Sequence, residues 1–160
     1  MENKLNSTRK ITVDRLDRNQ YGRVGLIYLE DSDNLYKHPL FKIPLLKENY
    51  ETLDKWNQAI LNQTGDEEYY QFARRGGIYI DYAFVKLKME YDPKNKLSTN
   101  IVRSVIKIDE IKQQGLSLEE VQKHLLKSKK VDITIKASSL YNHKDKKGIK
   151  YLIEQIDFTQ

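Results

Sequence analysis

Short stretches in which apolar and polar residues alternate predict the β-strands of this chain. In the N-terminal half, residues 9–16 and 23–29 have this pattern. Leu40–Leu46 is a short apolar segment that Pro44 interrupts, so we expect it at a sheet edge. An irregular acidic loop is expected over residues 30–39. The first quarter of the chain therefore reads as strands joined by loops.

The second half is richer in strand signals. Ile78–Tyr91 and Asn100–Asp109 flank a turn at Asp92–Lys96, which together predict a hairpin. Val131–Ser138 alternates strictly, and a polar, basic loop over Asn142–Gly148 leads into a last strand. We place that last strand over residues 149–158, so a second hairpin closes the sequence.

The spacing of apolar residues predicts a first amphipathic helix in the middle of the N-terminal half. In Tyr50–Asn62, the side chains of Leu53, Trp56 and Ile60 fall on one stripe. Residues 66–75 are expected to add one or two further helical turns, with acids first and arginines last.

The clearest helix start is at Ser117. Its hydroxyl can accept from the amide of Glu120 while the Glu120 carboxylate reaches back, which is a capping box. Leu118, Val121 and Leu125 then form the apolar stripe of a helix that ends in lysines.

From about residue 77 onward, the order of elements is compatible with an OB-fold, a five-stranded barrel with one helix between its third and fourth strands. A generic α+β sheet fits the same order. We expect an α+β fold, mostly antiparallel, with an OB-like barrel over residues 77–160. Residues 1–76 would supply N-terminal strands and a helix packed on the barrel, so that 160 residues form a single globular unit.

Charge divides the chain into two unequal halves. Residues 1–85 carry 12 basic and 13 acidic side chains, whereas residues 86–160 carry 16 basic and 10 acidic ones. AT-rich coding explains a high lysine content without any function, but it would act on both halves. The basic half therefore suggests a polyanionic partner.

Two segments near the end of the chain resemble a known family. Ser128–Lys136 is a strand rich in Val and Ile, and Tyr141–Glu154 begins with an aromatic residue, continues through a charged turn with Asp145 and Gly148, and returns through apolar residues. This pattern resembles the last hairpin of bacterial and phage single-stranded DNA-binding proteins. The resemblance implies an OB-fold and sequence-independent binding of single-stranded DNA.

The resemblance covers about thirty of the 160 residues, 128–158, and residues 1–75 do not match the family. Bacterial members usually continue into a Gly/Pro-rich tail with an acidic tip, whereas this sequence stops at Gln160. That difference favours a diverged form that acts in replication or recombination of a phage or mobile element, in the cytoplasm of a bacterial host.

The residue chemistry of the expected hairpin agrees with nucleic-acid binding. Phe84, Lys86 and Lys88 share one face of a strand, opposite three aliphatic residues, and Arg103 and Lys107 alternate on the return strand. Single strands are bound by cations that contact phosphates and by aromatic rings on which bases stack.

The last loop concentrates the same residue types, and we expect it to be mobile in the absence of a ligand. Its candidate binding residues are Tyr141, His143, Lys144, Lys146, Lys147, Lys150 and Tyr151. A solvated lysine face with half-buried tyrosines is the alternative interpretation. The sequence leaves RNA, self-association and replication proteins open as further partners.

Signals for catalysis, cofactors and membranes are weak. Cysteine is absent, which excludes disulfides and thiolate chemistry, and no phosphate-binding glycine loop or metal-ligand spacing is present. We therefore expect a binding protein rather than an enzyme, with no cofactor, no metal and no membrane span. Two alternatives remain: a phage interaction protein, either a virion component or a host-factor binder, and a nuclease whose carboxylates converge only in the folded chain.

Overall fold

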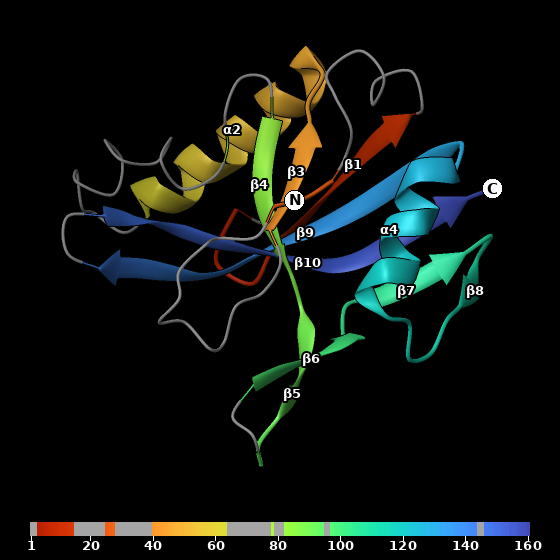
Figure 1. Cartoon of the computed structure of the whole chain (residues 1–160). Helices are drawn as coiled ribbons and strands as arrows, with labels where there is room; N and C mark the ends of the chain where they lie inside the picture. Colours follow the sequence, from red (N-terminus) through yellow and green to blue (C-terminus); the bar gives the residue numbers. More distant parts are fainter. Residues whose placement is uncertain are drawn as a thin grey trace.

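The computed structural model shows an α+β fold made mostly of strands, with two helices in the residues it describes (Figure 1). The described residues are 3–14, 25–27, 40–63, 78, 82–94, 97–143 and 146–160. The expected loop at 30–39 and the expected helical turns at 66–75 lie outside them.

Six strands follow one another across the main sheet, and their order differs from their order in the sequence. Neighbouring strands are antiparallel except for the parallel pair β10–β4. Across the sheet the strands are β1 (Thr8–Asp14), β9 (Lys130–His143), β10 (Lys146–Thr159), β4 (Tyr82–Leu87), β3 (Leu40–Pro44) and β2 (Gly25–Ile27). Strands from both halves of the sequence therefore form one sheet.

One edge of β10 is shared by two strands. β4 pairs with it at Leu152 and Ile153, and β7 (Val105–Ile108) pairs with it in the same direction from Gln155 to Phe158. β7 also forms a short hairpin with β8 (Ile111–Lys112).

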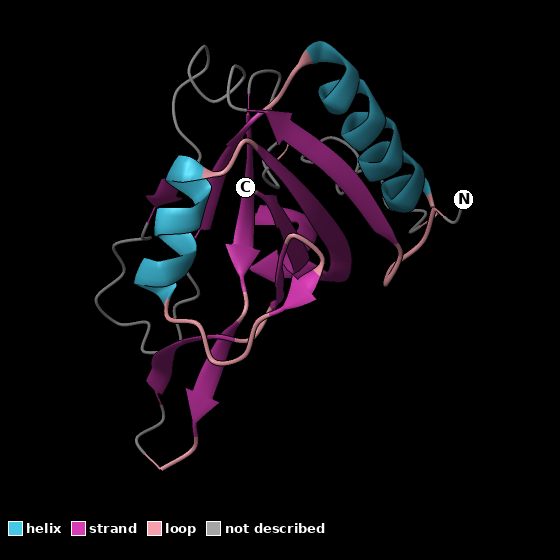
Figure 2. Cartoon of the chain, turned by 90° about the vertical axis from the view of Figure 1, so that its right-hand side faces the viewer, coloured by secondary structure: helices cyan, strands magenta, loops and turns pink. Residues whose placement is uncertain are grey.

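Between β4 and β7 the chain leaves the main sheet as a separate two-stranded hairpin. This hairpin consists of β5 (Met89–Asp92) and β6 (Leu97–Val102), and it projects away from the other strands in both views (Figures 1 and 2). We call residues 89–102 the arm.

Two helices pack on one face of the main sheet, which we call the buried face. α2 (Lys47–Asn62) places Trp56 against Tyr151, and α4 (Leu118–Lys127) places His124 against Phe158. The two helices lie apart from each other, toward different ends of the sheet (Figure 2). None of the described helices is long and apolar enough to cross a membrane.

The alternating segments form strands as expected, and their apolar residues line the core. In β9 the four buried residues are Val131, Ile133, Ile135 and Ala137, each with an exposed fraction of 0%. The helix predicted at Ser117 begins there with the complete capping box, and the helix predicted at residues 50–62 begins three residues earlier, at Lys47.

Pro44 terminates β3, as a residue without an amide hydrogen should. Although β3 lies between β2 and β4, β2 pairs only with Leu40–Lys42, so Pro44 has β4 alone as its ladder partner among the described strands.

The OB-like barrel over residues 77–160 is not confirmed, because no sheet closes among the described residues. The predicted hairpin does not form one continuous ladder. The first predicted strand, Ile78–Tyr91, gives β4, which pairs with β3 and β10, and β5. The second predicted strand, Asn100–Asp109, contributes to β6 and gives β7. Only β5 and β6 pair with each other as a hairpin.

The last loop is also shorter than expected. β9 and β10 remain paired as far as His143 and Lys146, with Tyr141 opposite Gly148. The mobile loop predicted from Tyr141 to Lys150 is therefore replaced, over the described residues, by a nearly complete β-ladder.

Candidate functional site

The face of the main sheet opposite the helices gathers lysines and aromatic rings from four strands. We call this set the basic face. Ladder pairing sets Lys42 beside Phe84 and sets Leu152 beside both Lys86 and Lys136. The basic face consists of Lys42, Tyr82, Phe84, Lys86, Lys136, Lys150 and Leu152.

Alternation along β4 explains why these side chains point together. Ala83, Val85 and Leu87 are fully buried, so Tyr82, Phe84 and Lys86 project from the opposite side of the strand and are half-buried. This confirms the predicted division of β4 into a core side and a polar side.

An aromatic pair lies at one end of the basic face. The rings of Tyr82 and Phe84 meet edge to face with their centroids 5.0 Å apart, and the Lys42 ammonium lies 4.8 Å from the centroid of Tyr82. Both contacts have the geometry that the ring quadrupole favours.

Lys86 is a partly buried cation that lies close to another lysine of the basic face. Its pKa is lowered, first because the side chain is partly removed from water and second because the Lys150 ammonium is close. Among the described residues no carboxylate lies within ion-pair distance of Lys86. An anion bound at Lys86 and Lys150 would offset both the partial loss of hydration at Lys86 and the repulsion between the two ammonium groups.

Lys88 has a different role from the one expected, because Glu154 already pairs with its ammonium. The distance from Lys88 Nζ to Glu154 Oε2 is 2.7 Å, and the Lys88 side chain is 18% exposed. This cation is therefore already paired, whereas no carboxylate in the described part of the chain pairs with Lys86.

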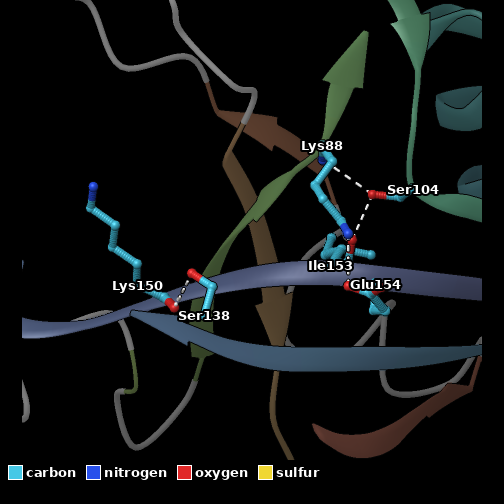
Figure 3. A network of polar contacts seen from close by, with 6 residues as sticks. All are labelled: Lys88, Ser104, Ser138, Lys150, Ile153 and Glu154. Carbon is cyan, nitrogen blue, oxygen red and sulfur yellow. Dashed lines mark hydrogen bonds and ion pairs between the residues drawn. The ribbon is translucent and has the colours of Figure 1, made fainter. Parts of the chain in front are cut away.

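Hydrogen bonds around Lys88 and Ser104 fix the base of the arm to β10 (Figure 3). The Lys88 amide donates to Ser104 Oγ at 3.1 Å, and that hydroxyl donates to the carbonyl of Ile153 at 2.6 Å. The Arg103 amide donates to the Lys88 carbonyl at 2.8 Å. The two ends of the arm thus meet over β10.

The remaining predicted cations are less clustered than expected. Arg103 is exposed at the base of the arm, whereas Lys107 lies on β7 beside Asp157. Lys150 is exposed, and its carbonyl accepts from Ser138 Oγ at 3.1 Å (Figure 3). Lys107 therefore belongs to a more acidic end of the sheet.

Tyr151 is a core residue, which corrects its assignment as a base-stacking ring. It is 3% exposed, packs against Trp56, and donates its hydroxyl hydrogen to Asn57 Oδ1. On β10 it shares the buried face with Ile149 and Ile153, and it lies beside Ala137 of β9.

Four other predicted residues of the last hairpin lie on β9 and β10 with only their backbone described: Tyr141, His143, Lys146 and Lys147. Lys144 lies outside the described residues. The assignment of these five to binding stays a prediction.

Of the lysines and aromatic residues of the basic face, sequence reasoning missed three, namely Lys42, Tyr82 and Lys136. The alternation of side chains along a strand could have identified each of them. Tyr82 is two residues from Phe84 and so lies on the same side of its strand. Lys42 lies between the buried Phe41 and Ile43, and Lys136 lies between buried residues of β9. What the sequence lacked was the pairing that makes these strands neighbours.

The opposite end of the same sheet gathers four carboxylates together with two lysines. Asp132 and Asp157 face each other across β9 and β10, beside a pocket of about 460 Å³ that Asp109, Glu110, Lys10 and Lys130 also line. Lys130 Nζ lies 3.7 Å from Asp132 Oδ2. In the described part of the chain, no three His, Asp or Glu side chains are placed to hold a metal ion. These carboxylates therefore add no support to the nuclease alternative.

Comparison with known proteins gives no relative for this chain. No family model, no curated protein and no solved structure matches it.

Proposed function

We propose that this protein binds single-stranded nucleic acid, DNA in the first instance, without sequence preference and through the basic face. The observation that carries the proposal is the position of Lys86, a half-buried cation without a carboxylate partner among the described residues, between Lys150 and the Tyr82–Phe84 ring pair. Phosphates would meet the lysines, and bases would stack on the exposed parts of the rings.

A closed barrel is not required for this activity. Some single-strand binders use an open four-stranded sheet whose aromatic side chains stack two or three bases. The main sheet here is open, and it carries its aromatic pair on the face opposite the helices. An OB-like ancestry, and a role in replication or recombination of a phage or mobile element, are proposed from the resemblance of residues 128–158 alone.

The test compares two triple variants of equal charge. Lys42, Lys86 and Lys150 are changed to Gln in the first, and the exposed Lys55, Lys112 and Lys123 are changed to Gln in the control. Fluorescence anisotropy with labelled single- and double-stranded oligonucleotides across a salt series measures affinity. Each lost phosphate contact should make the slope of log affinity against log salt concentration shallower by about 0.7. For the three lysines of the first variant, this slope should therefore be shallower by about 2.

Equal loss in both variants would mean that the effect is one of net charge and not of the basic face. A wild-type protein that prefers duplex, or whose binding is insensitive to salt, would refute the proposal. The lysines of the last hairpin are tested by changing Lys144, Lys146 and Lys147 to Ala in the same assay.

A further inference from the structure

Glu154 is placed among three cations at the point where the arm joins β10. Lys88 contacts it at 2.7 Å, and Arg103 is hydrogen-bonded through its amide to the Lys88 carbonyl. Lys136 pairs in register with Leu152, two residues before Glu154 on β10. Lys88 and Arg103 directly flank the arm on its two sides, and Lys136 comes from β9.

The three neighbouring cations favour the ionised form of the Glu154 carboxyl. The pKa of Glu154 is lowered, chiefly because Lys88 donates a hydrogen bond to the carboxylate, and the charges of Lys88, Lys136 and Arg103 lower it further. The carboxylate is therefore held as an anion, while its side chain remains 38% exposed.

A carboxylate and a phosphate are alternative acceptors for the same lysine and arginine donors. Lys88, Arg103 and Lys136 thus surround an anion that the protein itself supplies. Leu152 pairs with Lys136 on one side and with Lys86 on the other. The three cations around Glu154 are therefore adjacent to the basic face, which already includes Lys136.

We propose that Lys88, Arg103 and Lys136 form a second phosphate-binding site, that Glu154 occupies it in the free protein, and that a phosphate of the bound single strand takes its place. The proposal rests on the proposed function, since the strand is the one bound at the basic face. Glu154 then lowers the affinity of the protein, because each binding event must displace a paired carboxylate.

The test removes the carboxylate and keeps its shape. Glu154→Gln frees the three cations, and Glu90→Gln, at an exposed position on β5, is the control for losing one negative charge nearby. Relative to Glu90→Gln, the Glu154→Gln variant should bind a single-stranded oligonucleotide about two- to fivefold more tightly, the size of one exposed charge contact. Its salt slope should be steeper by about 0.7.

Lys136→Gln added to Glu154→Gln should abolish this gain, because it removes one of the freed cations. Thermal unfolding establishes that each variant is folded. If Glu154→Gln does not fold, Glu154→Asp, which withdraws the carboxylate by one methylene, should give a smaller change in the same direction. Equal or weaker binding by folded Glu154→Gln, relative to Glu90→Gln, would overturn the proposal.

A second probe separates this site from the proposed function. Tripolyphosphate is titrated into the wild-type, Glu154→Gln and Glu90→Gln proteins while the backbone amides are followed by NMR. The amides of Lys88, Arg103 and Lys136 should shift more in Glu154→Gln than in the other two. If no oligonucleotide binds to any variant but these shifts are seen, the proposed function fails and the phosphate site stands; without the shifts, the site fails too.

Discussion

The ring of Tyr151 lies 5.5 Å from that of Trp56, centroid to centroid, with the planes tilted by 50°. Tyr151 also donates to the buried Asn57, whose Nδ2 has no hydrogen-bond partner among the residues that the structure describes. This aromatic pair joins α2 to β10 and places Tyr151 in the core, beside the exposed Lys150.

Removal of the Tyr151 hydroxyl should therefore destabilise the fold without affecting binding. In Tyr151→Phe, Asn57 Oδ1 loses the hydroxyl that donates to it, and an unsatisfied buried polar group costs about 1–3 kcal/mol. Urea denaturation should show this loss, while oligonucleotide affinity at equal folded concentration should be unchanged. A drop in affinity with unchanged stability would show that Tyr151 acts in binding and not as a core residue.

Lys86→Met should stabilise the protein and weaken binding. Replacing this half-buried ammonium removes its desolvation and its repulsion of Lys150, which lies two residues from Leu152, the strand partner of Lys86, and a cross-strand charge contact is worth about 0.2–1 kcal/mol. The paired measurement is urea denaturation and anisotropy on the same preparation. Lys55→Met, at an exposed helix position, serves as the control and should leave both quantities almost unchanged. A destabilised Lys86→Met variant would show that the ammonium has a structural partner.

Phe84→Leu should reduce affinity but leave the salt slope alone. Leucine retains apolar bulk beside Tyr82 but has no ring, and stacking of a base on an aromatic ring is worth about 1–3 kcal/mol. Anisotropy at several salt concentrations separates the two effects, since the lysines that set the slope are untouched. A slope that changes together with affinity would mean that Phe84 acts by positioning Lys86.

Acid should weaken the contribution of Glu154 to stability. Its pKa is lowered in the folded protein, mainly by the hydrogen bond from Lys88, so the stabilisation is present above the ordinary value of 4.5 and is lost as the pH falls through the lower folded value. The difference in unfolding free energy between wild type and Glu154→Gln should stay constant near neutral pH and shrink below pH 4.5.

Urea denaturation between pH 7 and pH 3 measures that difference, with Glu90→Gln as the control. A difference that grows toward pH 3 would contradict the assignment of the lowered pKa to Glu154. High salt should reduce the difference at neutral pH, because the carboxylate is partly exposed.

The sequence was sufficient to identify which side of each element is buried. Alternation in β4 and β9, the stripe that includes Trp56 in α2, and the capping box at Ser117 are local patterns, and local patterns depend only on the period of the backbone. The division of β4 into a lysine side and a core side was predicted for the same reason.

The partner of each strand was not predictable in the same way. β4 and β7 both pair in parallel with β10, far along the chain, and the alternation of residues 82–108 is compatible with a simple hairpin as well. Because Lys42, Tyr82, Lys136 and Glu154 become neighbours only through such long-range pairing, the full basic face and the Glu154 cluster could not be assembled from sequence. Tyr151 alternates in step with the apolar Ile149 and Ile153, which is a signal for burial that the assignment of its ring to base stacking overlooked.

The junction at Lys88 and Arg103 makes the arm an insertion point. Because β4 and β7 lie along one edge of β10 and the Arg103 amide bonds the Lys88 carbonyl, the main sheet is continuous past the place where the arm leaves it. Met89 and Val102 pair across the base of the arm, and both are buried. We therefore expect residues 90–100 to tolerate exchange for a short turn or for a foreign peptide while the scaffold beneath them stays the same, and Ile101 to be needed because it bridges to Ser117 at the start of α4.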